Sequence, residues 1–304
     1  MSSVDLSQIS QPDIIKIPDF EDELAGTKAL IINAFPQEQR DAVTRALEME
    51  SEPMNALAQT LTWRIIYLLQ RINEAVRAVL LSSALKNDLD QIAANFDVKR
   101  LVITEATETT DAVMESDEEL RARVLLSWAK LSTAGARNAY HYYARSADAD
   151  VLDVKAYGPE THSQEGCVFL YVLSRTGNGT ASQPLLDKVA ASVNDESVRP
   201  LTDFVSVRTA EIIPYNVTAD IHIPYGLDVE LVLREAGEAV KKYVNDSHLL
   251  HVTAARSGIS GALHQPGVIT VKLHSPTTDI VPEMGQAPWC DRIQLNPVII
   301  DHDQ

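Results

Sequence analysis

The feature that most constrains this chain is a stretch of about thirty residues, Met54 to Ala84, that contains neither glycine nor proline. Its apolar residues recur at alternating steps of four and three, which is the a/d seam of a heptad repeat. The seam consists of Leu61, Ile65, Leu68, Ile72, Ala75 and Val79, and Leu69, Val76 and Leu80 widen it. At a rise of ~1.5 Å per residue, the stretch predicts a helix of about 45 Å.

Two interpretations of this helix are open. An apolar stripe on a helix usually packs into the core of the same chain, here a large helical bundle. Alternatively, the stripe is covered by helices of other chains. The second interpretation gains weight because the other helices predicted in the N-terminal third are short and few, such as the one over residues 37–49.

The hydrophobic period changes along the rest of the chain. A capping box at Ser116 and Glu119 begins a helix, and a second helix follows over residues 138–147. Beyond Ala149, strands are predicted at 151–156, 167–173 and 204–213, with a helix at 182–193 before the last strand. Strand, strand, helix, strand indicates a compact α/β sandwich.

A smaller α+β unit is predicted after this sandwich. It has alternating strands at 215–223 and 268–273 and helices at 229–244 and 257–264, whereas the proline-containing tail from Pro276 is expected to run along a surface. The predicted fold class is α+β, with an N-terminal long-helix bundle arm (1–100), a central α/β domain (101–213) and a C-terminal dimerisation domain with the tail (214–304). Pairing of the last domain across a two-fold axis is assigned to Val217, Ile221, Ile223, Val240 and Val244.

Charge and composition argue against several classes of partner. With 26 Lys+Arg against 43 Asp+Glu, the formal net charge is -17, which disfavours nucleic acid and anionic membrane surfaces. No segment has the ~20 consecutive apolar residues of a membrane-spanning helix. Two cysteines cannot build a structural zinc site by themselves, and the N-terminus has no signal-peptide pattern. We therefore expect synthesis in the cytoplasm.

The search for catalytic chemistry finds only weak candidates. His248 and His251 are spaced i, i+3, which is not the His-Glu-x-x-His of a zinc protease, and Ser260 lies outside a Gly-x-Ser-x-Gly elbow. The Gly177-Asn178-Gly179 turn has no Gly-Lys-Ser/Thr after it. The sequence therefore predicts no enzyme, no metal and no cofactor. A hydrolase using His248, His251 or Ser260 remains the alternative, together with a helical adaptor that pairs two other proteins.

A series of ordered segments then resembles one known family. They are residues 50–53 (ESEP), 71–79 (RINEAVRAV), 87–90 (NDLD), 112–117 (AVMESD), 145–148 (RSAD), 172–175 (VLSR) and 198–200 (VRP). In this order and at these separations they resemble the baseplate assembly protein J family of P2-like contractile phages and R-type pyocins. The resemblance extends over nearly the whole chain, from about Asp5 to Cys290.

The resemblance implies a structural role in the baseplate of a contractile tail. In that family, two copies pair with one smaller wedge protein, protein I, through a helical bundle, and six such wedges join into a ring around the central hub and spike. It further implies contacts with neighbouring wedges and a sheath-linking baseplate protein, assembly in the bacterial host cytoplasm, and release as part of the tail particle. The bundle residues would be Leu61, Ile65, Leu68, Ile72, Ala75, Val76 and Val79.

Overall fold

The computed structural model describes residues 6, 9–107, 109–131, 137–196 and 198–300 of the chain. The fold is a mixed α+β structure, which confirms the predicted class. The chain forms two compact units, the first made of residues 1–99 and 116–121 and the second of residues 100–115 and 122–304. The predicted division into three domains stays a prediction, although its boundary at 213/214 falls inside a strand, as described below.

The first unit is built from helices. They are α1 (Phe20–Ala34), α2 (Arg40–Glu48), α3 (Pro53–Ala78) and α4 (Lys86–Ala94), and a short 3₁₀ helix (Gln37–Gln39) precedes α2. The Asp19 side chain caps α1 by accepting a hydrogen bond from the Glu21 N–H at 2.9 Å, and Pro53 begins α3 at a position where no N–H is needed. Helices α1, α2 and α3 pack on one another around Leu24, Val43, Leu47 and Ala58.

The long helix α3 is shorter than the sequence predicts. It ends at Ala78 rather than near Ala84, so Val79 is its C-cap and α3 spans about 39 Å. Polar groups satisfy the carbonyl groups at this end: Ser83 Oγ donates to the Arg77 carbonyl at 2.7 Å, and the Arg121 guanidinium donates to the Leu81 and Ala84 carbonyls at 2.7 and 2.8 Å. The sequence did not predict this turn, because residues 79–84 contain neither glycine nor proline.

The helix α5 (Asp117–Ser127) begins with the predicted capping box. The Glu119 N–H donates to Ser116 Oγ and the Ser116 N–H donates to the Glu119 carboxylate, both at 3.2 Å. Before it, the chain forms a small antiparallel hairpin of β1 (Val102–Thr104) and β2 (Val113–Met114). Glu115, the residue after β2, forms a buried ion pair with Arg123. The Arg123 guanidinium donates two hydrogen bonds of 2.7 Å to the Glu115 carboxylate.

The central part of the second unit is the predicted α/β sandwich. Its sheet has the order β3-β4-β5, with β3 (Val151–Tyr157) antiparallel to β4 (Cys167–Ser174) and β4 parallel to β5 (Phe204–Thr209). The helices α6 (Arg137–Ala147) and α8 (Gln183–Val193) pack against this sheet through a shared apolar core, and a short α7 (Pro159–His162) lies between β3 and β4. Gly179 turns the chain with φ +97°, and a Cβ there would lie 2.8 Å from the His248 ring.

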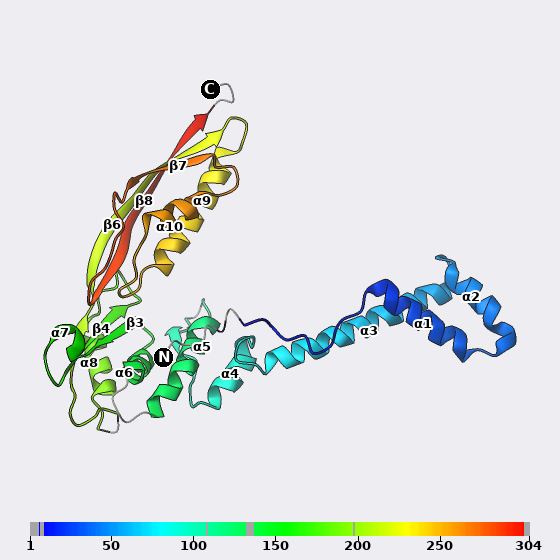
Figure 1. Ribbon diagram of the computed structural model, residues 1–304, viewed down its shortest axis with the longest axis horizontal. Coiled ribbons are helices and arrows are strands. Elements are labelled where there is room, and N and C mark those ends of the chain that lie inside the picture. Colours follow the sequence, from blue (N-terminus) through cyan, green and yellow to red (C-terminus); the bar gives the residue numbers. More distant parts are fainter. Residues whose placement is uncertain (1–5, 7–8, 108, 132–136, 197, 301–304) are drawn as a thin grey trace. The chain divides into compact units, whose positions relative to one another are not determined.

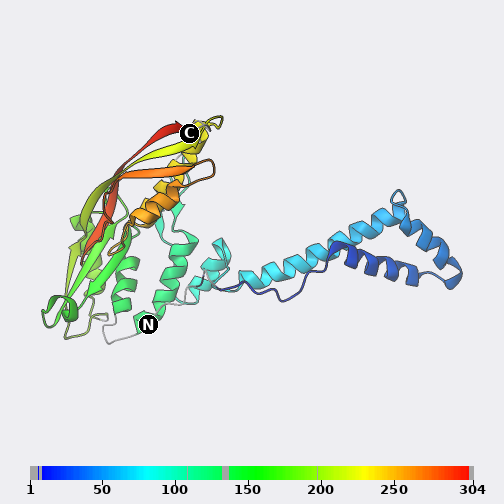
Figure 2. The same cartoon turned by 45° about the horizontal axis from the view of Figure 1, so that its top comes forward.

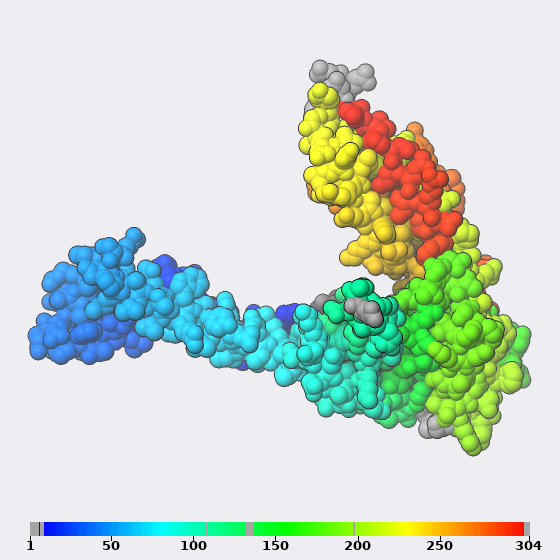
Figure 3. All heavy atoms as spheres, turned by 180° about the vertical axis from the view of Figure 1, so that it is seen from behind, coloured from blue at the N-terminus to red at the C-terminus, as the bar shows by residue number. Residues whose placement is uncertain are grey.

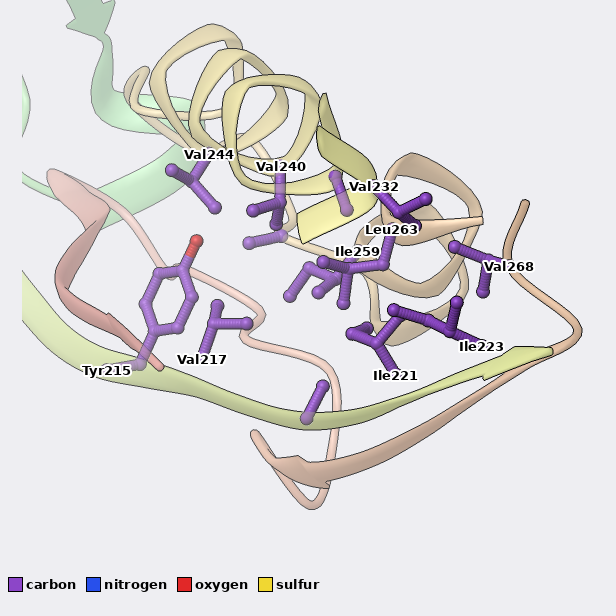
Figure 4. Close-up of a cluster of buried hydrophobic side chains, with 13 residues drawn as sticks. Tyr215, Val217, Ile221, Ile223, Val232, Val240, Val244, Ile259, Leu263 and Val268 are labelled. Atoms are coloured by element: carbon purple, nitrogen blue, oxygen red, sulfur yellow. The ribbon is translucent and has the colours of Figure 1, made fainter. Parts of the chain in front are cut away.

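The C-terminal part of the second unit has a sheet of order β7-β6-β8. Strand β6 (Glu211–Pro224) is central, antiparallel to β7 (Thr270–Ser275) and parallel to β8 (Gln286–Ile300). The helices α9 (Val229–Asp246) and α10 (Arg256–Leu263) contribute to the same core. Figure 4 shows side chains of β6 such as Val217, Ile221 and Ile223 pointing toward Val240, Ile259 and Leu263 of the helices.

Two sequence expectations about this part are wrong. The strand predicted over 204–213 is two strands, since β5 ends at Thr209 and β6 begins at Glu211. The tail with its prolines does not simply run along a surface, because residues 286–300 form β8, a full strand of the sheet.

The prolines fit β8 because it is an edge strand. Pro288 lies opposite Ile213 and Pro297 opposite Ile221, so they are nine residues apart on β8 but eight apart on β6. A bulge at Asp291, where Tyr215 and Asn216 face Cys290 and Arg292, absorbs the extra residue. Both prolines therefore have the same orientation, with the missing N–H on the side of β8 that faces away from β6, where no ladder bond is lost.

Candidate partner interface

One stripe of α3 is covered by its own chain along the whole helix. The buried residues of this stripe are Asn55, Ala58, Thr62, Ile66 and Asn73. Over the first half of α3 the cover is α1, which runs antiparallel to it: the Phe20 ring stacks on Trp63 at 4.6 Å and Thr27 contacts Thr62. This side of α3 is therefore part of the intramolecular core.

Over the second half of α3 the cover is an extended segment, residues 9–18, which we call the N-terminal strap. The strap continues the antiparallel course of α1, since Ile15 lies at Asn73 and Asp13 forms an ion pair with Arg77. Figures 1 and 2 show it as a dark blue line along α3 in both views. Residues 9–18 have no helical or strand periodicity, so the sequence did not predict this segment.

Asn73 holds the strap through its main chain. The Ile15 N–H donates to Asn73 Oδ1 at 3.0 Å, and Asn73 Nδ2 donates to the Ile15 carbonyl at 2.8 Å. The Asn73 residue is 2% exposed, and an asparagine in a helix interior costs stability unless its amide is bonded. The only sequence signal was this polar residue beside an apolar seam.

A neighbouring side of α3 carries the predicted seam, and the described part of the chain leaves most of it uncovered. Leu61 is 51% exposed, Leu68 48%, Ile72 44% and Val79 71%. Ala75 is also exposed, whereas Ile65 and Val76 are half-buried. In the space-filling view, the middle of α3 is open on the face turned to the viewer and the strap shows only at its margin (Figure 3).

Such a row of apolar side chains is costly to leave in water. Full burial of a Leu or Ile side chain stabilises by ~1.5–3 kcal/mol, so covering a half-exposed one contributes about 1 kcal/mol. A continuous exposed apolar row on a helix is typical of a protein–protein contact. The interpretation as an internal core helix predicts buried side chains at these positions, and the exposure of Leu61, Leu68 and Ile72 argues against it.

The residues assigned to dimerisation need a correction. Val217, Ile221, Ile223 and Val240 are 0% exposed and Val244 is 5% exposed, all within the core between β6 and the helices. The alternation of β6 was interpreted correctly as one buried face, but the chain's own helices bury it. These five side chains are not available to a second copy, and a dimer through this unit would use surface residues instead.

The residues of the hydrolase alternative have local structural roles. His248 is buried, its Nδ1 lies 2.6 Å from the Pro288 carbonyl, and its ring packs edge-on against Trp289 at 4.9 Å. Burial lowers the pKa of His248. His251 is an exposed turn residue with φ +60°, and Ser260 lies inside α10. No hydrogen bond recorded among the described residues joins any two of the three.

Two further features bear on the class of protein. Within the described ranges, no three His, Cys, Asp or Glu side chains are grouped so that they could hold a metal ion. No helix among those same residues combines the length and the apolar character needed to cross a bilayer.

Comparison with known proteins gives a consistent result along the chain. The baseplate J-like N-terminal domain matches residues 50–107, which include α3 and α4, and the baseplate J-like central domain matches residues 132–209, which include β3, β4 and β5. Baseplate protein J of Escherichia phage P2 is 40% identical over 299 residues, covering 97% of this chain and 98% of that protein. The resemblance seen in the sequence is thereby confirmed, and so is the prediction that the chain is not an enzyme. The chain belongs to the baseplate J family and is a structural protein of the contractile-tail baseplate.

Proposed function

We propose that this chain is a wedge subunit of the baseplate, in which two copies combine with one smaller wedge protein. Six such wedges would form the ring around the hub and spike. The ring holds the tail closed and rearranges when the sheath contracts. The single observation that carries this proposal is the division of α3 into one face covered by its own chain and one apolar face left open.

The open face suits helical partners. Its residues Leu61, Leu68, Ile72 and Ala75 lie on heptad positions, so a second helix can pack along them with knobs-into-holes contacts. The half-buried Ile65 and Val76 lie beside this row and widen the contact. In the proposed wedge, one helix on this face comes from a second copy and one from the smaller wedge protein.

A second contact between copies is proposed for the C-terminal part of the second unit. The exposed apolar residues Tyr225, Ile269 and Ile299 lie at one end of its sheet, because the Tyr225 N–H donates to the Ile300 carbonyl, the Ile269 N–H donates to the His222 carbonyl, and Ile299 lies opposite Ile223. These surface residues replace the core residues of the sequence prediction as the candidate dimer contact.

The remaining partners follow from the proposed position in the ring: neighbouring wedges, a sheath-linking baseplate protein and the central hub. We propose assembly in the bacterial host cytoplasm and release as part of a tail particle.

The test is co-expression of the full chain with the smaller wedge protein of the same contractile tail, followed by native mass measurement. The proposal expects a complex of two copies of this chain and one of the smaller protein. A one-to-one complex that never enters tail-sized particles would favour the helical adaptor instead, and no complex at all would overturn the bundle.

A further inference from the structure

The covered stripe of α3 differs from the open face in carrying polar residues, which we call the polar stripe: Asn55, Thr62 and Asn73. We propose that the polar stripe reserves this face of α3 for segments of the same chain and thereby limits how many partner helices α3 can accept. This inference rests on the proposed function, because it concerns what else can lie along the same helix.

Each member of the polar stripe is bonded to a different segment of its own chain. Asn55 Nδ2 donates to the Met49 carbonyl at 3.2 Å, in the turn before α3. Thr62 Oγ1 donates to the Ala58 carbonyl at 2.9 Å and lies 3.1 Å from Thr27 Oγ1 of α1. Asn73 is bonded to Ile15 of the strap. The three contacts together cover the stripe from one end of α3 to the other.

Asn73 discriminates most strongly between an extended segment and a helix, because it binds both the N–H and the carbonyl of one residue. An extended segment offers the N–H and the carbonyl of the same residue, as Ile15 does. The backbone groups within a helix are already used by the i to i−4 bonds of that helix. A foreign helix on this face would therefore leave the Asn73 amide buried without partners, a cost that the strap avoids.

Buried asparagines in coiled coils have a comparable effect. A single buried asparagine at a core position of a coiled coil fixes register and the number of helices at some cost in stability. Here the asparagine acts together with the strap it holds. The exposed ion pair between Arg77 and Asp13 adds little to this selection, since exposed pairs are weak.

The test uses the full chain alone, so that it is independent of wedge assembly. Asn73→Leu extends the apolar row of Ile66 along the stripe and removes the bond to the strap. Gln70→Leu is the matched control, with the same gain of apolar surface at an exposed position off the stripe. Tryptic cleavage after Lys16 reports release of the strap, light scattering gives the mass, and circular dichroism confirms helical content. If Asn73→Leu does not fold, Asn73→Ala takes its place.

A second variant separates the strap from the stripe. Ile15→Pro removes the N–H that Asn73 accepts but leaves the Asn73 amide on α3. We expect cleavage after Lys16 to be about tenfold faster or more in both Asn73→Leu and Ile15→Pro, whereas only Asn73→Leu gains additional copies in its assembly. Wild-type cleavage rates in both variants would overturn the bond to the strap. Release of the strap with unchanged mass in Asn73→Leu, or equal mass gain in Ile15→Pro or Gln70→Leu, would overturn the limiting role of the stripe.

Should no complex form with the smaller protein, the proposed function fails, while the cleavage and mass of the chain alone still decide this inference.

Discussion

The helix α3 and the strand β6 each carry a row of apolar side chains along their length, and the chain treats the two rows in opposite ways. The apolar side of β6 is completely covered by α9 and α10, with Val217, Ile221 and Ile223 excluded from water. The apolar seam of α3 is left open, and its polar stripe is covered instead. Periodicity therefore predicts that a face will be buried, but not which chain buries it.

The strongest way to break this comparison is to place charges on the open face. We expect Leu68→Asp with Ile72→Asp to leave the chain folded, because both side chains are about half exposed already. Assembly with the smaller wedge protein should be lost, since two charges in the contact remove several kcal/mol of association free energy. Circular dichroism checks the fold and co-purification checks assembly. Global unfolding would assign the seam to an internal core.

The matched change on β6 should have the opposite result. Ile221→Asp puts a carboxylate into a core where the wild-type side chain is 0% exposed, so we expect a loss of about 4 kcal/mol or more in the free energy of unfolding of the second unit. Hydrogen exchange should show loss of protection in β6 and α9 but not in α1 and α3. Tolerance of this change would mean that β6 is less closed than its burial indicates.

A smaller effect should distinguish the two units by pH. All eight histidines follow residue 140, so the first unit contains none. Burial, with Lys155 nearby, lowers the pKa of His141 from 6.5 to about 4, and the Ala156 N–H donates to its Nε2 at 3.1 Å. As the pH falls, His141 takes up a proton in the unfolded chain before it does so in the folded chain. The free energy of unfolding of the second unit should therefore fall by up to about 3 kcal/mol between pH 6.5 and 4.

Hydrogen exchange at pH 6.5 and 4.5 measures this loss separately in each unit. His141→Gln keeps an acceptor for the Ala156 N–H without titrating, and it should flatten much of the pH dependence of the second unit. An equal pH dependence in α1 and α3 would count against His141 as the cause.

The smallest expected effects come from the helix caps. Asp19 accepts from the Glu21 N–H in the first unit, and Asp228 accepts from the Glu230 and Leu231 N–H groups in the second. Each substitution by alanine should cost about 1 kcal/mol, measured by urea unfolding. Asp19→Ala should also speed cleavage after Lys16, because α1 and the strap are continuous, whereas Asp228→Ala should not.

The sequence predicted elements well where the period was strong and the ends were marked. The capping box at Ser116, the strands β3 and β4, and α9 follow the expected pattern. It failed where physical context decides. The strap has no periodicity, and contacts with distant residues of α3 hold it, chiefly the two hydrogen bonds between Ile15 and Asn73. Pro288 and Pro297 suggested a surface tail. An edge strand also tolerates proline, and the sequence alone does not show that this segment pairs with β6.

For the candidate interface, the seam residues stay a prediction, whereas the five side chains predicted for dimerisation are buried in the core. Leu61, Leu68 and Ile72 are apolar at heptad spacing, and their exposure could only be seen once α1 and the strap were found on the other side. Val240 and Val244 show the same kind of pattern and are core residues. The difference lies in the cover supplied by distant segments, which no local pattern records.

The edge formed by β8 affects whether strands of other chains can pair with this sheet. A long strand with one free side invites another strand to add to it, and fibres grow in this way. Pro297 removes a donor on that side, and at Pro288 the same side is occupied by His248, whose Nδ1 lies 2.6 Å from the Pro288 carbonyl. In a baseplate, where protein chains lie close together, such an interrupted edge disfavours unwanted pairing with a strand of another chain.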